Sequence, residues 1–275
     1  VLEFPLSRYE EQELELVVWA EDQAGNRRWL NDRGLFTDMQ ESGSFELLQV
    51  NETDIFAVPA WAQGCIYYQI FPERFARRGP TGAGMDDWNA APTRDNVLGG
   101  NLGGIIDRIP YLSELGVECL YLNPIFTGDF NHKYATTDYF SVDPMFGTKD
   151  TLRELVARCH EAGIRVILDG VFSHTGEDSR YFNRYGHYDT VGAYQSKESP
   201  WYDWYTFRTY PTDYACWWNI PSLPEVKEDH PDYQRFMFQP KEGIVPRWLH
   251  AGASGWRLDV ADELPMDFLR QLRSR

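Results

Sequence analysis

One short stretch decides the fold: Gly163-Ile164-Arg165-Val166-Ile167-Leu168-Asp169. Its aliphatic run is typical of a buried strand in a parallel sheet. The glycine in front of the run is typical of the residue that ends a helix. The stretch therefore predicts a helix, a tight turn and a strand that places Asp169 at its carboxyl end.

The same pattern occurs upstream. Residues 102–115 carry apolar side chains on one face and predict an amphipathic helix closed by Gly116, followed by a strand over 117–122. An apolar strand over 65–71 precedes them, and Thr148 is a suitable N-cap for the next helix. Alternating strands and helices of this kind predict parallel βα units. The long loops follow the strands, as at the active-site face of a (β/α) barrel.

The alternation of strands and helices does not extend to the segments on either side of these units. Residues 1–57 are β-rich, with strands expected over 14–19 and 44–50 around a turn at 22–26. Residues 175–225 are aromatic and polar and predict an inserted subdomain. Beyond them we expect elements in three segments: a helix over 231–249, a strand over 255–260 and a helix from about Pro265.

Composition narrows the class of ligand. The chain has 26 basic and 42 acidic residues, a net charge of -16, which disfavours nucleic acid and anionic membranes as partners. With 10 Trp, 16 Tyr and 16 Phe it is rich in the flat rings that line sugar-binding clefts, although most aromatic residues fill cores. None of the four cysteines forms a CxxC pair and no histidine cluster accompanies them, so no metal centre is predicted. No apolar run is long enough for a membrane span and no signal peptide opens the chain, which predicts a cytoplasmic setting.

Three groups of polar residues lie where loops follow predicted strands. Asp169 is followed by His174, although the pair alone is more typical of a loop cap and a surface histidine than of a site. Arg257 and Asp259 alternate onto one face of a strand, where the arginine favours the ionised carboxylate that a glycosidase nucleophile needs. A structural ion pair would give the same pattern. Tyr134 lies in the loop after the second strand, where it offers a ring for stacking.

Together these groups resemble the conserved regions of the α-amylase superfamily of glycoside hydrolases. The likeness runs from residue 61 to residue 275. Finer motifs resemble the branch of cyclomaltodextrinases, neopullulanases and maltogenic amylases. These motifs are Tyr67-Tyr68-Gln69-Ile70-Phe71-Pro72-Glu73-Arg74-Phe75, the run from Tyr134 to Asp143-Pro144-Met145-Phe146-Gly147, and Trp217-Trp218-Asn219-Ile220-Pro221-Ser222-Leu223-Pro224-Glu225.

The resemblance implies a fold and its domains. The fold class is α/β, the first half of a (β/α)8 TIM-type barrel with an inserted subdomain after the third strand. Part of a β-sandwich-like N-terminal domain precedes it. The implied domains are 1–57, the C-terminal part of a starch-binding-type domain; 58–174, barrel strands 1–3; 175–225, the inserted subdomain; and 226–275, the barrel through strand 4.

The resemblance also implies roles for site residues. Asp259 would be the nucleophile of a retaining hydrolase, and Arg257 would hold it ionised. The implied substrate-binding residues are Tyr134, His132, His174, Asp169 and Trp218. The substrate would be an α-linked glucan such as a cyclodextrin, a maltodextrin or pullulan, with transglycosylation as a further reaction. No cofactor is required, and a homodimer is implied.

Two departures from the family pattern matter. The general acid of the family has no counterpart, so the chain is expected to be a piece of a longer enzyme and inactive alone. Ser173 stands where many α-amylases have a calcium-binding asparagine, which leaves a structural calcium ion to the loop with Asp86, Asp87, Asn89 and Asp95 or leaves that loop solvated. The alternative functions are a non-catalytic α-glucan-binding homologue and an α-glucosidase of another branch.

Overall fold

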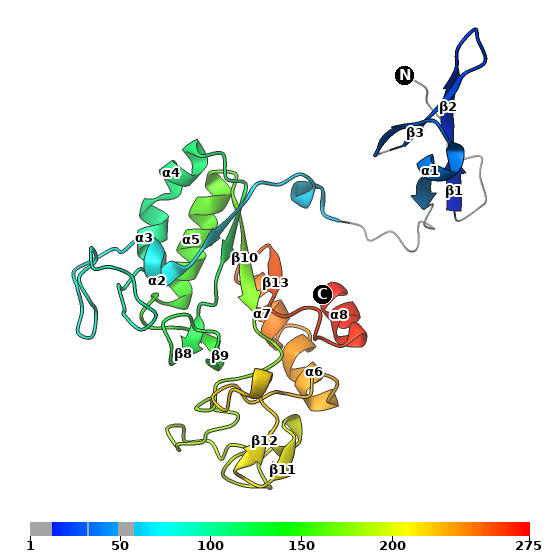
Figure 1. Cartoon of the computed structure of the whole chain (residues 1–275). Helices are drawn as coiled ribbons and strands as arrows, with labels where there is room; N and C mark the ends of the chain where they lie inside the picture. Colours follow the sequence, from blue (N-terminus) through cyan, green and yellow to red (C-terminus); the bar gives the residue numbers. More distant parts are fainter. Residues whose placement is uncertain (1–12, 32, 49–57) are drawn as a thin grey trace. The chain divides into compact units, whose positions relative to one another are not determined.

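The computed structural model describes residues 13–31, 33–48 and 58–275, and the chain divides after Gly64 into two compact units (Figure 1). The first unit is β-rich. Strand β1 (Glu13–Leu16) pairs antiparallel with β5 (Phe45–Leu48), while β2 (Val18–Glu21), β3 (Arg27–Asn31) and β4 (Gly34–Phe36) form a separate antiparallel sheet. A short helix, α1 (Met39–Ser42), and a 3-10 turn, η2 (Ala60–Ala62), complete its described elements.

Both strands predicted in this unit are present, the second as β5, but the first is not continuous. The run predicted over 14–19 is divided at Val17 between β1 and β2, and β3 and β4 were not predicted. The expected turn at 22–26 is present, since the Asp22 carboxylate accepts hydrogen bonds from the backbone N–H groups of Ala24 and Asn26. Residues 1–12 and 49–57 of the predicted domain lie outside the described residues.

The second unit is built on four parallel strands. They are β6 (Tyr67–Ile70), β7 (Cys119–Leu122), β10 (Arg165–Gly170) and β13 (Gly255–Leu258), in the order β13-β10-β7-β6. The register pairs Gln69 with Tyr121 and Asp169 with Arg257, so these polar side chains share one face at the carboxyl ends of the strands. The parallel arrangement predicted from the sequence is confirmed.

Helices α3 (Leu102–Asp107), α4 (Ile109–Glu114) and α5 (Lys149–Glu161) lie along this sheet, and a short helix, α2 (Pro72–Phe75), follows β6 (Figure 1). The prediction of one helix over 102–115 was wrong. The helix breaks at Arg108 because Pro110, in the first turn of α4, has no N–H to continue the ladder. Gly116 and Gly163 follow α4 and α5 with φ of 80° and 77°, as the sequence predicted. Thr148 caps α5 through its side chain.

Long excursions follow the carboxyl ends of the strands (Figure 1). After β7 comes an unpredicted hairpin of β8 (Phe126–Gly128) and β9 (Thr136–Val142). Between β10 and α6 (Pro231–Phe238) the chain forms η3 (Tyr202–Trp204), the hairpin of β11 (Phe207–Thr209) and β12 (Asp213–Tyr214), and η4 (Trp217–Asn219). Both excursions lie beyond the end toward which β10 points.

The C-terminal segment differs from its prediction in two places. The helix expected over 231–249 is two helices, α6 (Pro231–Phe238) and α7 (Ile244–His250), because Pro240 and Lys241, with φ of 70°, interrupt it. The strand expected over 255–260 ends at Leu258. The last helix is α8 (Met266–Arg273), which starts directly after Pro265 as expected.

An aromatic core supports the polar carboxyl edge of the sheet. Phe126, Tyr139, Phe172 and Trp248 are buried, and their rings pack against one another or against shared neighbours. The buried Trp248 indole N–H donates a hydrogen bond to the Tyr139 carbonyl at 2.9 Å, so this polar group of the core is satisfied. The site residues therefore stand on a closely packed base.

Candidate active site

Two aspartates share one guanidinium at the carboxyl edge of the sheet. Arg257 Nη1 lies 3.0 Å from Asp169 Oδ1 and 2.7 Å from Asp259 Oδ1. Asp169 is fully buried, whereas the Asp259 side chain keeps 16% of its surface exposed. Burial lowers the pKa of Arg257, but charge–charge attraction to Asp169 and the hydrogen bond to Asp259 outweigh it, and the net effect is a raised pKa. The guanidinium is therefore charged at every working pH. Of the two carboxylates, Asp259 is the one that a ligand can reach.

Two tyrosines complete the surroundings of Asp169. The hydroxyl groups of Tyr121 and Tyr134 both donate to Asp169 Oδ2, the latter at 3.0 Å. Burial raises the pKa of Asp169, while the hydrogen bonds from Tyr121 and the ion pair with Arg257 oppose that shift. Burial and Asp169 also raise the pKa of Tyr134 to about 12, so this hydroxyl stays a neutral donor. Asp169 thus accepts hydrogen bonds from Tyr121, Tyr134 and Arg257, and these bonds fix the positions of the Arg257 and Tyr134 side chains.

A second chain of hydrogen bonds runs across the first strands. Asn123 Nδ2 donates to the Tyr134 hydroxyl at 2.9 Å, and Gln69 Nε2 donates to Asn123 Oδ1 at 2.9 Å. Tyr121, Asn123 and Gln69 were not predicted as site residues. Their signal was available, since Gln69 and Tyr121 are polar residues within apolar strands and parallel pairing places them on the face of Asp169.

The backbone turns sharply directly after β13, at Asp259 and Val260. Asp259 N–H donates to the Gly170 carbonyl at 3.1 Å, which continues the pairing of β13 with β10. The next residue, Val260, has φ of 43°, an uncommon conformation for a β-branched side chain. Such strain persists where surrounding structure enforces it and is common at active sites. The turn at Val260 ends β13 and places Asp259 at the carboxyl edge of the sheet.

The two predicted histidines are brought to the same edge. His174 is buried, with Nε2 3.2 Å from the Tyr134 carbonyl and Nδ1 3.0 Å from the Ser173 hydroxyl. Burial lowers its pKa to about 4, despite the opposing effect of Asp259. His132 Nδ1 accepts from the Tyr134 N–H at 3.1 Å, and burial lowers its pKa as well. Both rings are therefore neutral hydrogen-bonding groups at neutral pH.

The burial of His174 predicts a loss of stability in acid. Above its unfolded-state pKa of 6.5 the group is neutral in both states; as the pH falls from 6.5 through about 4, the unfolded chain takes up a proton that the folded chain resists. The free energy of unfolding is expected to fall by about 3 kcal/mol across this range through this group. Urea unfolding at pH 7.0 and 4.5 should show a smaller pH effect in His174→Gln, whereas the exposed control His160→Gln should behave as wild type. An unchanged pH effect in His174→Gln would contradict this account.

An unpredicted carboxylate holds the tryptophans beside the site. Glu263 accepts hydrogen bonds from the indole N–H groups of Trp217 at 3.0 Å and Trp218 at 3.2 Å. Their rings are stacked with centroids 5.1 Å apart, and Trp217 packs against His174 with centroids 5.5 Å apart. Trp218 was predicted to bind substrate, and the residue is 73% exposed at this edge. Sequence reasoning missed Glu263 because its partners lie about 45 residues earlier in the chain.

Two carboxylates of the loop considered for calcium accept hydrogen bonds from backbone N–H groups nearby. Asp86 accepts from the Val97 N–H at 2.9 Å, and Asp87 accepts from the Asn89 N–H at 2.7 Å. Across residues 13–31, 33–48 and 58–275, no group of three or more His, Cys, Asp or Glu side chains is arranged to hold a metal ion. The same described ranges contain no helix long and apolar enough to cross a membrane.

Comparison with known proteins agrees with this geometry. Residues 69–272 match the family described as "Alpha amylase, catalytic domain". The chain belongs to the α-amylase family. The catalytic domain of this family is a (β/α)8 barrel, so the four parallel strands and their carboxyl-edge cluster belong to that architecture.

Relatives in the α-amylase family include several glucan-degrading enzymes. Neopullulanase 2 of Thermoactinomyces vulgaris is 35% identical over 90% of this chain and 43% of its own length. A cyclomaltodextrinase of Bacillus sp is 38% identical over 91% of this chain and 45% of its own length. This chain therefore spans less than half of either relative.

Solved structures show the same likeness. A cyclic α-maltosyl-(1→6)-maltose hydrolase from Arthrobacter globiformis, in complex with its cyclic sugar, superimposes with a TM-score of 0.71 at 32% identity, over 78% of this chain and 48% of that one. A cyclomaltodextrinase covers 96% of this chain and 46% of its own, with a TM-score of 0.69 at 34% identity.

Proposed function

We propose that the protein is a retaining glycoside hydrolase that acts on α-linked glucans, with Asp259 as its nucleophile. The observation that carries the proposal is the shared guanidinium of Arg257, which holds an accessible carboxylate beside a buried one at the carboxyl edge of the sheet. A carboxylate kept charged and aimed at the open edge is what attack on an anomeric carbon requires. The named activities of the relatives, on pullulan and cyclomaltodextrins, support this substrate class.

The reaction follows from this arrangement. Asp259 attacks the anomeric carbon as the glycosidic carbon–oxygen bond breaks, and the departing oxygen takes a proton from a carboxylic acid. Water then attacks the same carbon and releases Asp259, so the configuration of the sugar is retained. Arg257 stays charged throughout and keeps Asp259 ionised and oriented.

The residues around Asp259 have complementary roles in the proposal. The Tyr134 ring stacks under the sugar that is attacked, and His132 offers a hydrogen bond to one of its hydroxyl groups. His174 is buried with both ring nitrogens engaged, so its bond to a sugar hydroxyl would replace the one to the Tyr134 carbonyl. Trp218 offers an exposed ring to a more distant part of a cyclic or branched glucan. Asp169 acts indirectly, because its hydrogen bonds to Arg257 and two tyrosines fix the others in place.

The proposed reaction also needs a carboxylic acid that donates a proton to the leaving oxygen. Asp169 is unsuited to donate to a leaving oxygen, since it is fully buried and three donors already occupy it. The prediction that a polypeptide of residues 1–275 alone does not hydrolyse maltodextrins follows from the family pattern, in which the general acid has no counterpart here, and it stays a proposal. Homodimerisation and the division of the chain at 57, 174 and 225 are likewise proposals that follow from the family.

The test is sugar release by the full protein from β-cyclodextrin, pullulan, maltoheptaose and maltose. Release of glucose and maltose from the ring, with retained anomeric configuration by NMR, is the expected result. Activity confined to maltose would support an α-glucosidase of another branch. Binding of β-cyclodextrin without any turnover would support the alternative of a non-catalytic homologue and overturn the hydrolase proposal.

A further inference from the structure

An exposed phenylalanine lies beside the candidate active site without a structural reason for its exposure. The Phe130 side chain is 45% exposed, and its ring stacks on His132 with centroids 5.2 Å apart and an interplanar angle of 8°. His132 in turn packs against Tyr134, with centroids 5.7 Å apart. The three rings form a row that leads outward from the hydroxyl of Tyr134 on Asp169.

The loop that carries these rings is held rigidly by a buried ion pair. Lys133 has φ of 59°, and its ammonium group lies 2.8 Å from Asp143 Oδ2 and donates to the Gly128 carbonyl at 2.7 Å. Both charged side chains are almost fully buried, at 5% and 7% exposure. Lys133 N–H also closes a turn onto the Phe130 carbonyl at 3.1 Å. Preorganisation of this kind lowers the entropic cost of binding a ligand to the loop.

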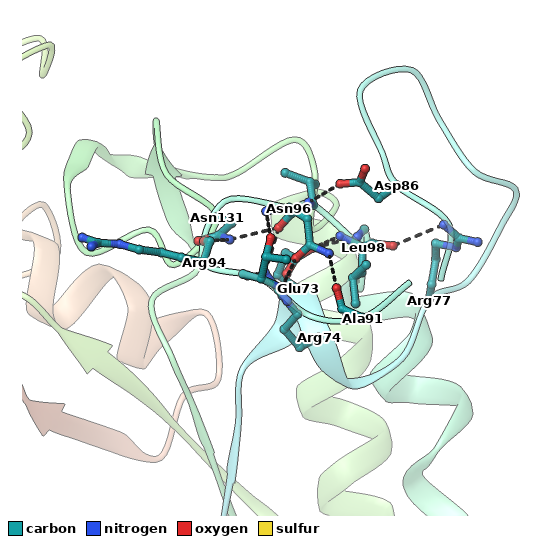
Figure 2. A network of polar contacts seen from close by, with 12 residues as sticks. Glu73, Arg74, Arg77, Asp86, Ala91, Arg94, Asn96, Leu98 and Asn131 are labelled. Carbon is teal, nitrogen blue, oxygen red and sulfur yellow. Dashed lines mark hydrogen bonds and ion pairs between the residues drawn. The ribbon is translucent and has the colours of Figure 1, made fainter. Parts of the chain in front are cut away.

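A second contact fixes the loop from the opposite side. Asn131 Nδ2 donates to the carbonyl groups of Arg94 and Asn96 at 3.1 Å each (Figure 2). The Asn96 carbonyl also accepts from Arg74 at 2.7 Å, and Arg74 pairs with the buried Glu73. Figure 2 shows these groups converging between the two loops, while the Arg94 side chain points away from the network. Phe130 is thus exposed on a loop that is anchored by its neighbour Asn131 and by Lys133.

We propose that Phe130, backed by His132, is a stacking platform for a glucose unit of the α-glucan beyond the unit that contacts Tyr134. This inference rests on the proposed function. The apolar C–H face of a pyranose ring packs well on the negative face of an aromatic ring, and a flat, neutral pair of rings provides that surface. The row from Tyr134 through His132 to Phe130 gives the direction in which a chain of linked sugars would extend.

The proposal predicts a dependence on glucan length. The variants are made in the full protein with Asp259→Asn, which is expected to keep sugar binding and prevent turnover, and the protein with Phe130 intact is the wild type of this comparison. Calorimetric titration with maltose and with maltoheptaose should show that Phe130→Ala weakens maltoheptaose binding about tenfold and leaves maltose binding unchanged. Phe130→Trp keeps a flat ring and should bind maltoheptaose as wild type does. Phe130→Leu keeps apolar volume without a flat face and should behave as Phe130→Ala. Tyr111→Ala, which removes an exposed ring from α4, is the matched control and should change neither affinity.

Three results would count against the platform. Unchanged maltoheptaose affinity in Phe130→Ala, with normal binding by wild type, would overturn the platform and leave the proposed function intact. An equal loss for maltose and maltoheptaose would show that Phe130 acts through the positions of His132 and Tyr134, which also overturns it. Failure of wild type to bind either sugar would overturn the proposed function and the platform together.

Discussion

Replacement of Asp259 by asparagine is expected to slow hydrolysis of β-cyclodextrin by the full protein at least about a thousandfold. The amide keeps the shape of the side chain and a hydrogen-bond acceptor for Arg257, so the pocket should persist. It cannot form the glycosyl ester, because an uncharged amide is a poor nucleophile toward an anomeric carbon. The loss should therefore fall on kcat, with sugar binding largely kept.

Asp262→Asn is the matched control, since Asp262 is an exposed aspartate three residues further along the same turn. It should retain wild-type turnover. Wild-type turnover in Asp259→Asn, with the control also active, would show that another group attacks the sugar. In that case the pair of Arg257 and Asp259 would be structural.

Replacement of Arg257 by methionine is expected to lower the free energy of unfolding by about 3 kcal/mol, because it leaves the buried Asp169 without its cation. The estimate is at the lower end for a broken buried pair, since Arg257 is itself 38% exposed and two tyrosines still donate to Asp169. Urea unfolding at pH 7 measures the loss. The same variant should lose turnover, because Asp259 loses its partner.

A double-mutant cycle separates charge from packing. In an Asp169→Asn background the unpaired charge is absent, so Arg257→Met should cost only about 1 kcal/mol more. The guanidinium also lies over the Tyr121 ring at 5.4 Å, and that contact accounts for the remainder. Equal losses in both backgrounds would contradict the view that Asp169 depends on Arg257 for its charge.

The sequence predicted the framework because its signals are local. Glycines after the helices, the Thr148 cap and the apolar runs fixed four parallel strands and the helix ends at Gly116 and Gly163. The strand-end positions of Asp169, Arg257 and Asp259 followed from alternation along the strands. The structure brings these three residues together, while their catalytic and binding roles remain proposals.

The structure differs from the prediction where a backbone constraint or a contact distant in the sequence overrides the local pattern. Apolar periodicity continues through residues 102–115 and 231–249, but Pro110 and Pro240 break the hydrogen-bond ladder there. Val260 ends its strand early through a positive φ that its side chain gives no reason to expect. The link from Glu263 to two tryptophans joins segments far apart in the sequence, and periodicity carries no information about such contacts.

The central claim is that Asp259 forms a covalent bond to the sugar, and trapping of that intermediate tests it most directly. The full protein would be incubated with a fluorinated α-glucosyl fluoride, which slows release of the glycosyl group from the enzyme, digested at low pH and analysed by mass spectrometry. The account predicts one added sugar on the peptide that contains Asp259, and none on that peptide in Asp259→Asn. A sugar attached to a different carboxylate in the wild-type protein would contradict it.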